Sequence, residues 1–221
     1  MKVCGLIIVA IALTFGNVLT TFSVAQDSAP EFSQKGYLPL PWLLQEVGSK
    51  YECFFTIEDS MNENDPLSSL RAQRVAKLSD ARNLADELER LRRTVPNFLY
   101  EINKDNPKIV HIIDARLLQK KQYALQGIIG KIDFNGQINE LPAAISKQGI
   151  AIYPMLVVMT SEQPDFITTV EVKGERLSVR DALTNFVPLE GRIGRTIWIA
   201  RTNVAEDSLT HIYYPWSGKK P

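Results

Sequence analysis

The sequence has few of the residues that most often bind metals. It contains two cysteines, Cys4 and Cys53, and two histidines, His111 and His211, all far apart along the chain. Zinc sites and similar metal centres need several such side chains at short spacing. We therefore expect no metal site. No nucleotide-binding or other cofactor motif is present either, so we expect no cofactor.

An excess of charge of either sign is also missing. Lysine and arginine together number 25, and aspartate and glutamate together number 25, so the net charge is zero. Nucleic-acid-binding proteins carry a basic patch or stripe, and proteins that bind anionic lipid carry basic clusters. We therefore expect no nucleic-acid partner. Hydrophobic residues make up 45% and charged residues 23% of the chain, which is the composition of a folded protein.

Motifs for catalysis are absent as well. There is no Gly-x-Ser-x-Gly nucleophile elbow, and Gly127–Lys131 lacks the spacer and the Ser or Thr of a phosphate-binding loop. Cys53 stands beside Glu52, so it is predicted to be a buried structural residue rather than a reactive thiol. His111 is predicted to be a structural residue inside a strand. The mixed charges from Asp86 to Arg93 are typical of a solvated helix face. We therefore expect no catalytic residue and favour a non-enzymatic protein.

The amino terminus has the pattern of a secretory signal peptide. Lys2 is followed by the apolar run Val3–Phe15, and the small residues Ser23 and Ala25 stand where signal peptidase requires them. The apolar run ends at Gly16 and is shorter than the 20 or so residues of a spanning helix. Residues 1–25 are thus predicted to be removed after Ala25, which leaves a secreted or periplasmic chain that is not inserted in the membrane. Residues 26–35 are polar and are predicted to be a disordered leader.

The remaining chain shows a weak internal duplication. The first copy covers residues 36–118 and the second covers residues 131–205, with residues 119–130 as a linker or strand and residues 206–221 as an aromatic tail. Each copy has the predicted order β-α-β-(β)-α-β. The predicted fold class is therefore α+β, with two similar small modules that each place their helices on one face of a mixed sheet.

Turn and capping residues set the predicted helix ends. In the first copy, Pro41 begins a helix that ends at Gly48, and Ser79 or Asp80 caps a longer helix that ends before Pro96. In the second copy, the predicted N-caps are Asn139 and Ser178, the latter in a capping box with Asp181, and Gly149 ends the helix that Asn139 begins. The predicted closing strands are 108–113 and 195–200.

The second copy resembles the small modules at the amino terminus of secretins and TonB-dependent transducers. The matching features are the strand Lys131–Phe134, the helix Ile138–Ile145, the V-x-V-x-G step at Val170–Gly174 and the helix Leu177–Leu183. The chain carries Leu189-Glu190-Gly191 where those modules have Thr-Gly-Leu. The resemblance implies an extracytoplasmic module that contacts other proteins of the cell envelope and has no pore of its own.

Aromatic residues supply the candidate interface. Trp198 alternates with Ile197 and Ile199 in the last predicted strand, so we expect it on the outer face, opposite the helix that carries Leu183. Tyr213, Tyr214 and Trp216 form an aromatic cluster in the tail. Such a cluster either folds back on the second module as an edge strand or serves as a recognition peptide.

Two functions remain open at this point. The first is a non-enzymatic protein-interaction module of the cell envelope, which offers a sheet edge or an inter-module groove to an envelope partner. The alternative is a small-molecule-binding protein or hydrolase with its site between the modules. An interaction module should show an exposed edge strand and no deep polar pocket, whereas an enzyme should show convergent titratable groups with shifted pKa values in a cleft.

Overall fold

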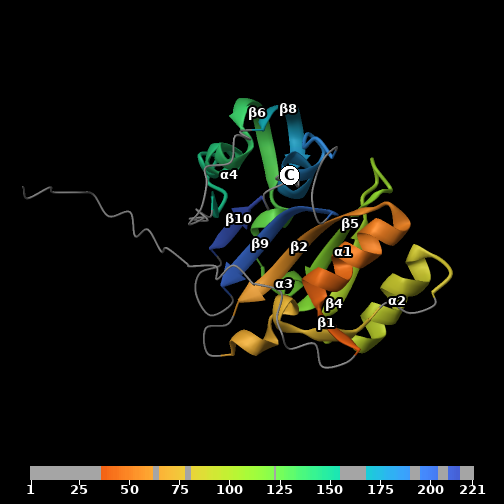
Figure 1. The fold of residues 1–221 in the computed structure, drawn as a ribbon. Helices are drawn as coiled ribbons and strands as arrows, with labels where there is room; N and C mark the ends of the chain where they lie inside the picture. The colour runs from red at the N-terminus through yellow and green to blue at the C-terminus, as the bar shows by residue number, and fades with distance from the viewer. Residues whose placement is uncertain are drawn as a thin grey trace, which may run out of the picture.

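The computed structural model describes residues 36–61, 65–77, 81–121, 123–154, 168–189, 195–203 and 209–214. Its central element is a six-stranded mixed sheet with the order β4-β5-β2-β9-β10-β7 (Figure 1). The strands β5, β2 and β9 are parallel to one another, β4 and β10 are antiparallel to their neighbours β5 and β9, and β7 is parallel to β10. Their bounds are β2 Phe54–Met61, β4 Phe98–Ile102, β5 Ile109–Asp114, β7 Ile152–Pro154, β9 Thr196–Asn203 and β10 Thr210–Tyr213.

Two antiparallel ribbons and a set of short helices complete the fold. The ribbons are β1 (Tyr37–Pro39) with β3 (Arg74–Ala76), and β6 (Ile128–Gln137) with β8 (Thr169–Ser178). The α-helices are α1 Leu40–Tyr51, α2 Leu84–Thr94, α3 Ala115–Leu118, α4 Leu141–Ser146 and α5 Val179–Thr184, and the 3-10 turns are η1 Pro66–Ser68, η2 Leu70–Ala72, η3 Ala124–Gln126 and η4 Ile138–Glu140. The predicted α+β class is confirmed. None of the helices in these ranges is long and apolar enough to span a membrane.

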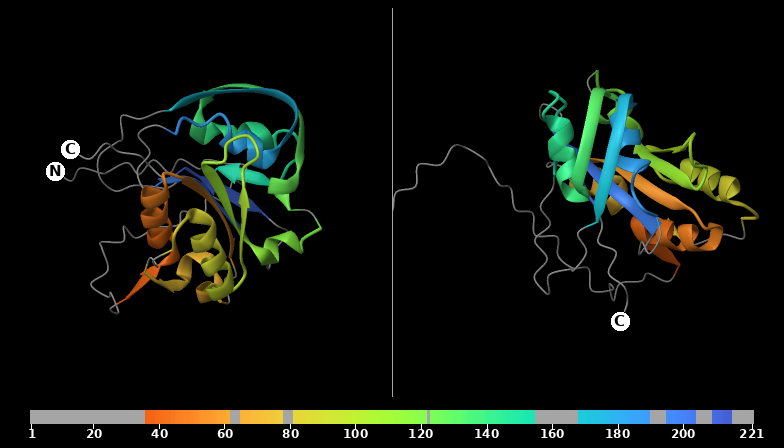
Figure 2. Two further views of the ribbon diagram at one scale, coloured as in Figure 1. Left: turned by 90° about the vertical axis from the view of Figure 1, so that its right-hand side faces the viewer. Right: turned by 90° about the horizontal axis from the view of Figure 1, so that it is seen from above.

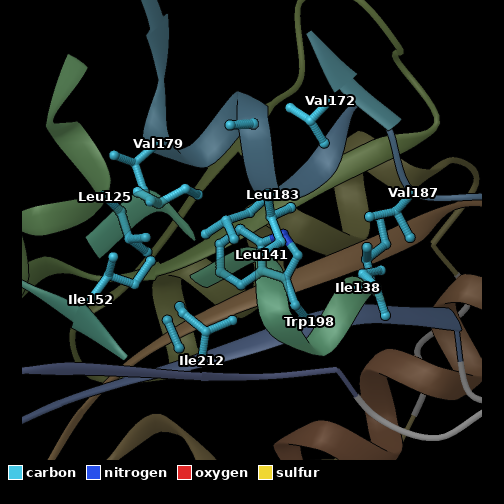
Figure 3. Close-up of a cluster of buried hydrophobic side chains, with 14 of the residues drawn as sticks. Leu125, Ile138, Leu141, Ile152, Val172, Val179, Leu183, Val187, Trp198 and Ile212 are labelled. Carbon is cyan, nitrogen blue, oxygen red and sulfur yellow. The ribbon is translucent and has the colours of Figure 1, made fainter. Parts of the chain in front are cut away.

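The sheet lies between two layers, one from each half of the chain (Figures 1 and 2). Side chains of α1 and α2 pack with one face of β2 and β5 in one hydrophobic core. Side chains of α4, α5 and the β6–β8 ribbon pack against the other face in a second core, part of which Figure 3 shows. The helices of each half therefore cover one face of the sheet, and the two halves use opposite faces.

The predicted order β-α-β-(β)-α-β is present in both halves, and each half has one strand that this order does not include, β4 in the first and β10 in the second. In both halves the strand before the first helix pairs with the strand before the second helix in an antiparallel ribbon. The two halves nevertheless share a single sheet, because β9 of the second half pairs with β2 of the first. The predicted closing strands β5 and β9 thus lie on either side of β2, both parallel to it. The predicted linker, residues 119–130, contains η3 and the first residues of β6.

Of three predicted helix N-caps, one is confirmed and two are wrong. Ser178 is the N-cap of α5, and its Oγ accepts a hydrogen bond from the backbone N–H of Asp181 (3.0 Å), as predicted. The N-cap of α2 is Asn83, whose Oδ1 accepts from the N–H of Asp86 (2.9 Å), so the predicted Ser79 or Asp80 cap is wrong; those two residues lie outside the described ranges. The predicted Asn139 cap is wrong as well, because the chain turns earlier. The N–H of Gln137 donates to the carboxylate of Glu140 (3.3 Å) and opens the turn η4.

The predicted outer face for Trp198 is also wrong. The pairing of β2 with β9 shifts in register between Phe55 and Thr56, so Phe55 pairs with Thr196 and Thr56 with Trp198, which leaves Ile197 as an extra residue in β9. This irregularity breaks the alternation of side chains. Ile197 and Trp198 both enter the second core, and Ile199 enters the first. Trp198 is fully buried beside Leu183 (Figure 3) and is therefore a core residue rather than an exposed interface residue.

Candidate functional site

The candidate site lies where two parallel strands end side by side. The connection from β2 to β5 runs through α2 on one face of the sheet, and the connection into β9 runs through α5 on the other face. The direction of winding therefore reverses between β2 and β9. In sheets of this kind, ligands bind beyond the carboxyl ends of the strands at such a reversal. Asp59 and Arg201 are register partners near these ends.

Asp59 is a buried carboxyl group with one unpaired oxygen. Its side chain is fully buried, and Oδ1 accepts a hydrogen bond from the backbone N–H of Leu70 (2.8 Å). Oδ2 has no hydrogen-bond partner. Burial raises the pKa of Asp59 to about 6, an effect that the Leu70 N–H, Arg71 and Arg201 partly oppose. Asp59 thus holds the turn η2 against the sheet and titrates close to neutral pH.

Two arginines flank this carboxyl group. Arg71 follows Leu70 in η2, and Arg201 extends from β9; both are half-buried. The Nε–H groups of both are buried and make no hydrogen bond. Burial lowers the pKa of Arg201, and the neighbouring positive charge of Arg71 lowers it further. Because an unpaired buried donor is costly, two neighbouring guanidinium groups in this state indicate a place for an anion.

Aromatic side chains continue the site toward the edge of the sheet. The guanidinium of Arg71 lies over the ring of Tyr213 (5.9 Å to the centroid). His211 is the register partner of Arg201, and Tyr153 is the register partner of His211. The rings of Tyr153 and His211 are 6.2 Å apart, and Tyr153 is 42% exposed. Burial, followed by Arg201, lowers the pKa of His211.

These six residues are called the cross-sheet row below: Asp59, Arg71, Tyr153, Arg201, His211 and Tyr213. The row runs over β2, β9, β10 and β7 on the face that α1 and η2 share. It draws on both halves of the chain.

A third arginine close by, Arg116, has hydrogen-bond partners for its guanidinium group. Arg116 donates from Nη2 and Nε to Asp114 (2.6 and 2.9 Å) and from Nη1 to the hydroxyl of Ser68 (3.0 Å). Ser60 also donates to Asp114 (2.6 Å). This network fixes η1 beside the end of β5, and it leaves Arg71 and Arg201 as the arginines of this region with unpaired buried atoms.

A further buried ion pair lies on the opposite face of the sheet. Arg180 donates from Nε and Nη2 to Glu58 (2.6 and 2.9 Å), and the hydroxyl of Tyr123 donates to the same carboxylate (2.7 Å). Glu58 is fully buried. Since each carboxylate oxygen has a partner, this pair joins α5 and η3 to β2 and is structural.

The predicted interface residues separate in the structure. Tyr213 belongs to the cross-sheet row. Tyr214 donates to the carbonyl of Leu183 (3.3 Å) and packs against the second core, so it faces the other side of the sheet. Trp216 lies outside the described residues. Residues Thr210–Tyr213 of the predicted tail form the strand β10, which lies between β9 and β7 rather than at an edge.

The structure bears on the predictions for Cys53 and His111. Cys53 is buried, as predicted, and burial raises the pKa of its thiol to about 11. His111 lies in β5, as predicted; its Nδ1 hydrogen-bonds with the hydroxyl of Thr56 (2.8 Å) and its Nε2 with the amide of Asn103 (3.2 Å). Burial lowers the pKa of His111 to about 3. Both groups are therefore uncharged at neutral pH.

The charged helix α2 departs in part from the predicted solvated face. Glu89 pairs with Arg92 and Arg93 at the surface, as expected for such a face. Glu87 is instead fully buried and pairs with Arg90. A depression on this helix is lined by Asp86, Glu89, Arg90, Arg93 and Thr94; Arg93 pairs with Glu89 there, and Arg90 pairs with the buried Glu87.

The buried His111 gives a first testable prediction. Since its pKa is lower in the folded chain than the ordinary value of about 6.5, the unfolded chain binds more protons between pH 6.5 and pH 3. Stability from the neutral imidazole is therefore complete above pH 6.5 and is lost as the pH falls. Between pH 7 and pH 5 we expect the wild type to lose about 2 kcal/mol more unfolding free energy than His111→Gln, measured by urea titration. Equal losses in the two proteins would contradict a buried neutral His111.

Among the residues that the structure describes, no three His, Cys, Asp or Glu side chains come together as a metal site. Comparison of the chain with protein-family models, with curated proteins and with solved structures finds no match. The functional argument therefore rests on the cross-sheet row itself. The row contains two guanidinium groups with unpaired buried Nε–H groups, one carboxyl group with a raised pKa and three aromatic rings, and these groups can bind a partner.

Proposed function

We propose that this chain is an exported, non-enzymatic protein-interaction module of the cell envelope, and that the cross-sheet row is its docking face. The observation that carries the proposal is the pair of guanidinium groups, Arg71 and Arg201, whose buried Nε–H groups have no partner. A protein that had no ligand at this place would be more stable with these donors paired. We therefore interpret the cross-sheet row as a surface that binds a partner protein.

The residue types of the row also support a protein partner. Tyrosine and arginine dominate the binding energy of protein interfaces, where they sit in a desolvated centre. Arg71, Arg201 and Tyr213 form such a half-buried centre, and the more exposed Tyr153 lies at its side. Tyr153 is in β7, the last strand of the six-stranded sheet, so a partner can extend past this edge.

The sequence supports the location in the envelope. The signal-peptide pattern of residues 1–25 predicts export, and the resemblance of residues 131–203 to secretin and TonB-transducer modules favours a protein that contacts other envelope proteins. The neutral states of Cys53 and His111 favour binding over catalysis, because neither is poised as a nucleophile or base at neutral pH.

The alternative of a small ligand between the two halves uses the same side chains. Asp59 and Arg71 come from the first half and Arg201 and Tyr213 from the second, so the row is an inter-module site. We favour a protein partner because Tyr153 and His211 extend the row across β10 to the sheet edge, which is wider than one small molecule requires.

Site-specific photocrosslinking tests this function in cells that produce the chain naturally. A photoreactive phenylalanine analogue is placed at Tyr153 in the row, and as a matched control at Ile128, which is 59% exposed in β6 away from the row. We expect one discrete adduct from position 153, formed with the mature chain that begins at Gln26, and none from position 128. The adduct should disappear when Arg71 and Arg201 are both changed to glutamine. Adducts that survive this double substitution, or no adduct at position 153, would contradict the proposal.

A further inference from the structure

The docking face has an unbalanced charge at its centre. Arg71 and Arg201 are close enough for each to affect the electrostatics of the other, and the nearest acidic group, Asp59, directs one oxygen to the backbone of Leu70. The other oxygen of Asp59 and both Nε–H groups are buried without a hydrogen bond. Three unpaired buried polar atoms therefore come from three elements, β2, η2 and β9, whose charged side chains influence one another.

The chemistry of this place selects its ligand. The two arginines carry two positive charges and Asp59 at most one negative charge, so the place attracts an anion. The planar guanidinium fork matches the two oxygens of a carboxylate.

We propose that Arg71 and Arg201 bind a carboxylate of the partner protein between them, and that Asp59 takes up a proton when this carboxylate binds. The proton on Asp59 Oδ2 converts this oxygen from an unpaired acceptor into a donor to the incoming carboxylate, so that all three unpaired atoms gain a partner. This inference rests on the proposed function, since it names the chemistry by which the docking face recognises its partner.

The surroundings of Asp59 set the direction of the pH effect. The charged or titratable groups that face it are Arg71 from η2, Arg201 from β9, Tyr213 from β10, Asp114 from β5 and Arg116 from α3. The positive charge of Arg201 also acts on His211. Asp114 opposes ionisation of Asp59, and burial opposes it more strongly. A bound carboxylate adds a second negative charge and opposes ionisation further. Affinity for a carboxylate should therefore rise as the pH falls toward 6 and below.

Three small probes of nearly equal size test the inference on the mature chain. N-acetyl-glutamate α-amide carries only a side-chain carboxylate, N-acetyl-glutamine carries only an α-carboxylate, and N-acetyl-glutamine amide carries none. Binding is measured by NMR from the Nε–Hε signals of Arg71 and Arg201. We expect saturable shifts with at least one of the two carboxylate probes and none with the amide. Which of the two binds more tightly shows whether the partner presents an acidic side chain or its carboxyl terminus.

The pH dependence of probe binding tests the proton uptake by Asp59. Between pH 7.5 and pH 5.5 we expect the affinity of the better carboxylate probe to rise roughly tenfold, because Asp59 changes from mostly ionised to mostly protonated in this range. Asp59→Asn retains an oxygen for the Leu70 N–H and is always neutral. This variant should bind the probe at pH 7.5 as tightly as the wild type does at pH 5.5, with little further change with pH. A wild-type-like pH dependence in Asp59→Asn would overturn the role of Asp59.

Further controls separate this inference from the proposed function. Arg201→Gln should abolish probe binding, whereas Arg92→Gln, which lies on the distant surface of α2, should leave it unchanged; circular dichroism verifies that each variant is folded. Inorganic phosphate that binds more tightly than either carboxylate probe would overturn the choice of carboxylate. If no probe binds, the inference is wrong, while the photocrosslink at Tyr153 still decides whether the row is a docking face.

Discussion

Trp198→Ala is expected to lower the free energy of unfolding by about 3–5 kcal/mol, the usual cost of removing a large aromatic side chain from a core. Trp198 is fully buried in the second core, and its indole Nε1 donates to the hydroxyl of Thr184 (3.0 Å). The substitution leaves a cavity beneath α5 and removes one of the two hydrogen bonds of that hydroxyl, which still donates to the carbonyl of Arg180. Urea unfolding followed by far-ultraviolet circular dichroism measures the loss.

Two comparisons assign this loss to the cavity. Trp198→Phe keeps most of the ring but loses the hydrogen bond, so it should cost clearly less than alanine. Ile128→Ala, at a side chain that is 59% exposed, should stay within about 0.5 kcal/mol of the wild type. If Trp198→Ala cost no more than Ile128→Ala, Trp198 would lie at the surface, as the simple alternation of β9 predicts.

The second large effect is expected at the buried ion pair on the same side of the sheet. Arg180→Met should destabilise the fold by about 3–5 kcal/mol, because it leaves the carboxylate of Glu58 buried without its counter-ion. Glu58 is fully enclosed in β2, and the hydroxyl of Tyr123 alone would remain to hydrogen-bond with it. Chemical denaturation at pH 7 provides the measurement.

A double variant makes this prediction specific to the charge. Glu58→Gln combined with Arg180→Met removes both charges and should recover a large part of the lost stability. Arg92→Met breaks a surface pair with Glu89 and should leave the unfolding midpoint close to that of the wild type. Additive losses in the double variant would show that the two side chains do not act as a pair.

The periodicity of the sequence predicts much of the fold, because local patterns report local structure. Most strands and helices of both halves, the Ser178 cap and the burial of Cys53 follow from residues that are close together in the sequence, whereas the strand β4 is not predicted. The face of Trp198 does not, because the register shift arises where β9 pairs with β2, a strand from the other half of the chain. An alternation rule applied to β9 alone has no means of detecting the extra residue.

The sequence alone does not predict the candidate site, for a related reason. Arg201 stands out in the sequence only as an arginine after a closing strand, and Asp59 only as an acidic residue late in an apolar strand. Arg71 carries no signal of its own. Their relation depends on the pairing of β2 with β9 and on the Leu70 N–H that Asp59 holds. Tyr213 was a candidate from its aromatic neighbours, but its place beneath Arg71 follows from β10 entering the sheet.

The pairing of β2 with β9 has a consequence for how the chain folds. β2 is the third strand of the sheet, yet one of its two neighbours is made of residues 196–203, near the other end of the described chain. Contacts between segments so distant in the sequence form late in folding, because the entropic cost of closing the long loop between them must be overcome first. The first half therefore cannot complete its sheet while the second half is still being synthesised. For a chain predicted to cross a membrane in an unfolded state, this delay is an advantage: the native sheet can close only after nearly the whole polypeptide has emerged on the far side.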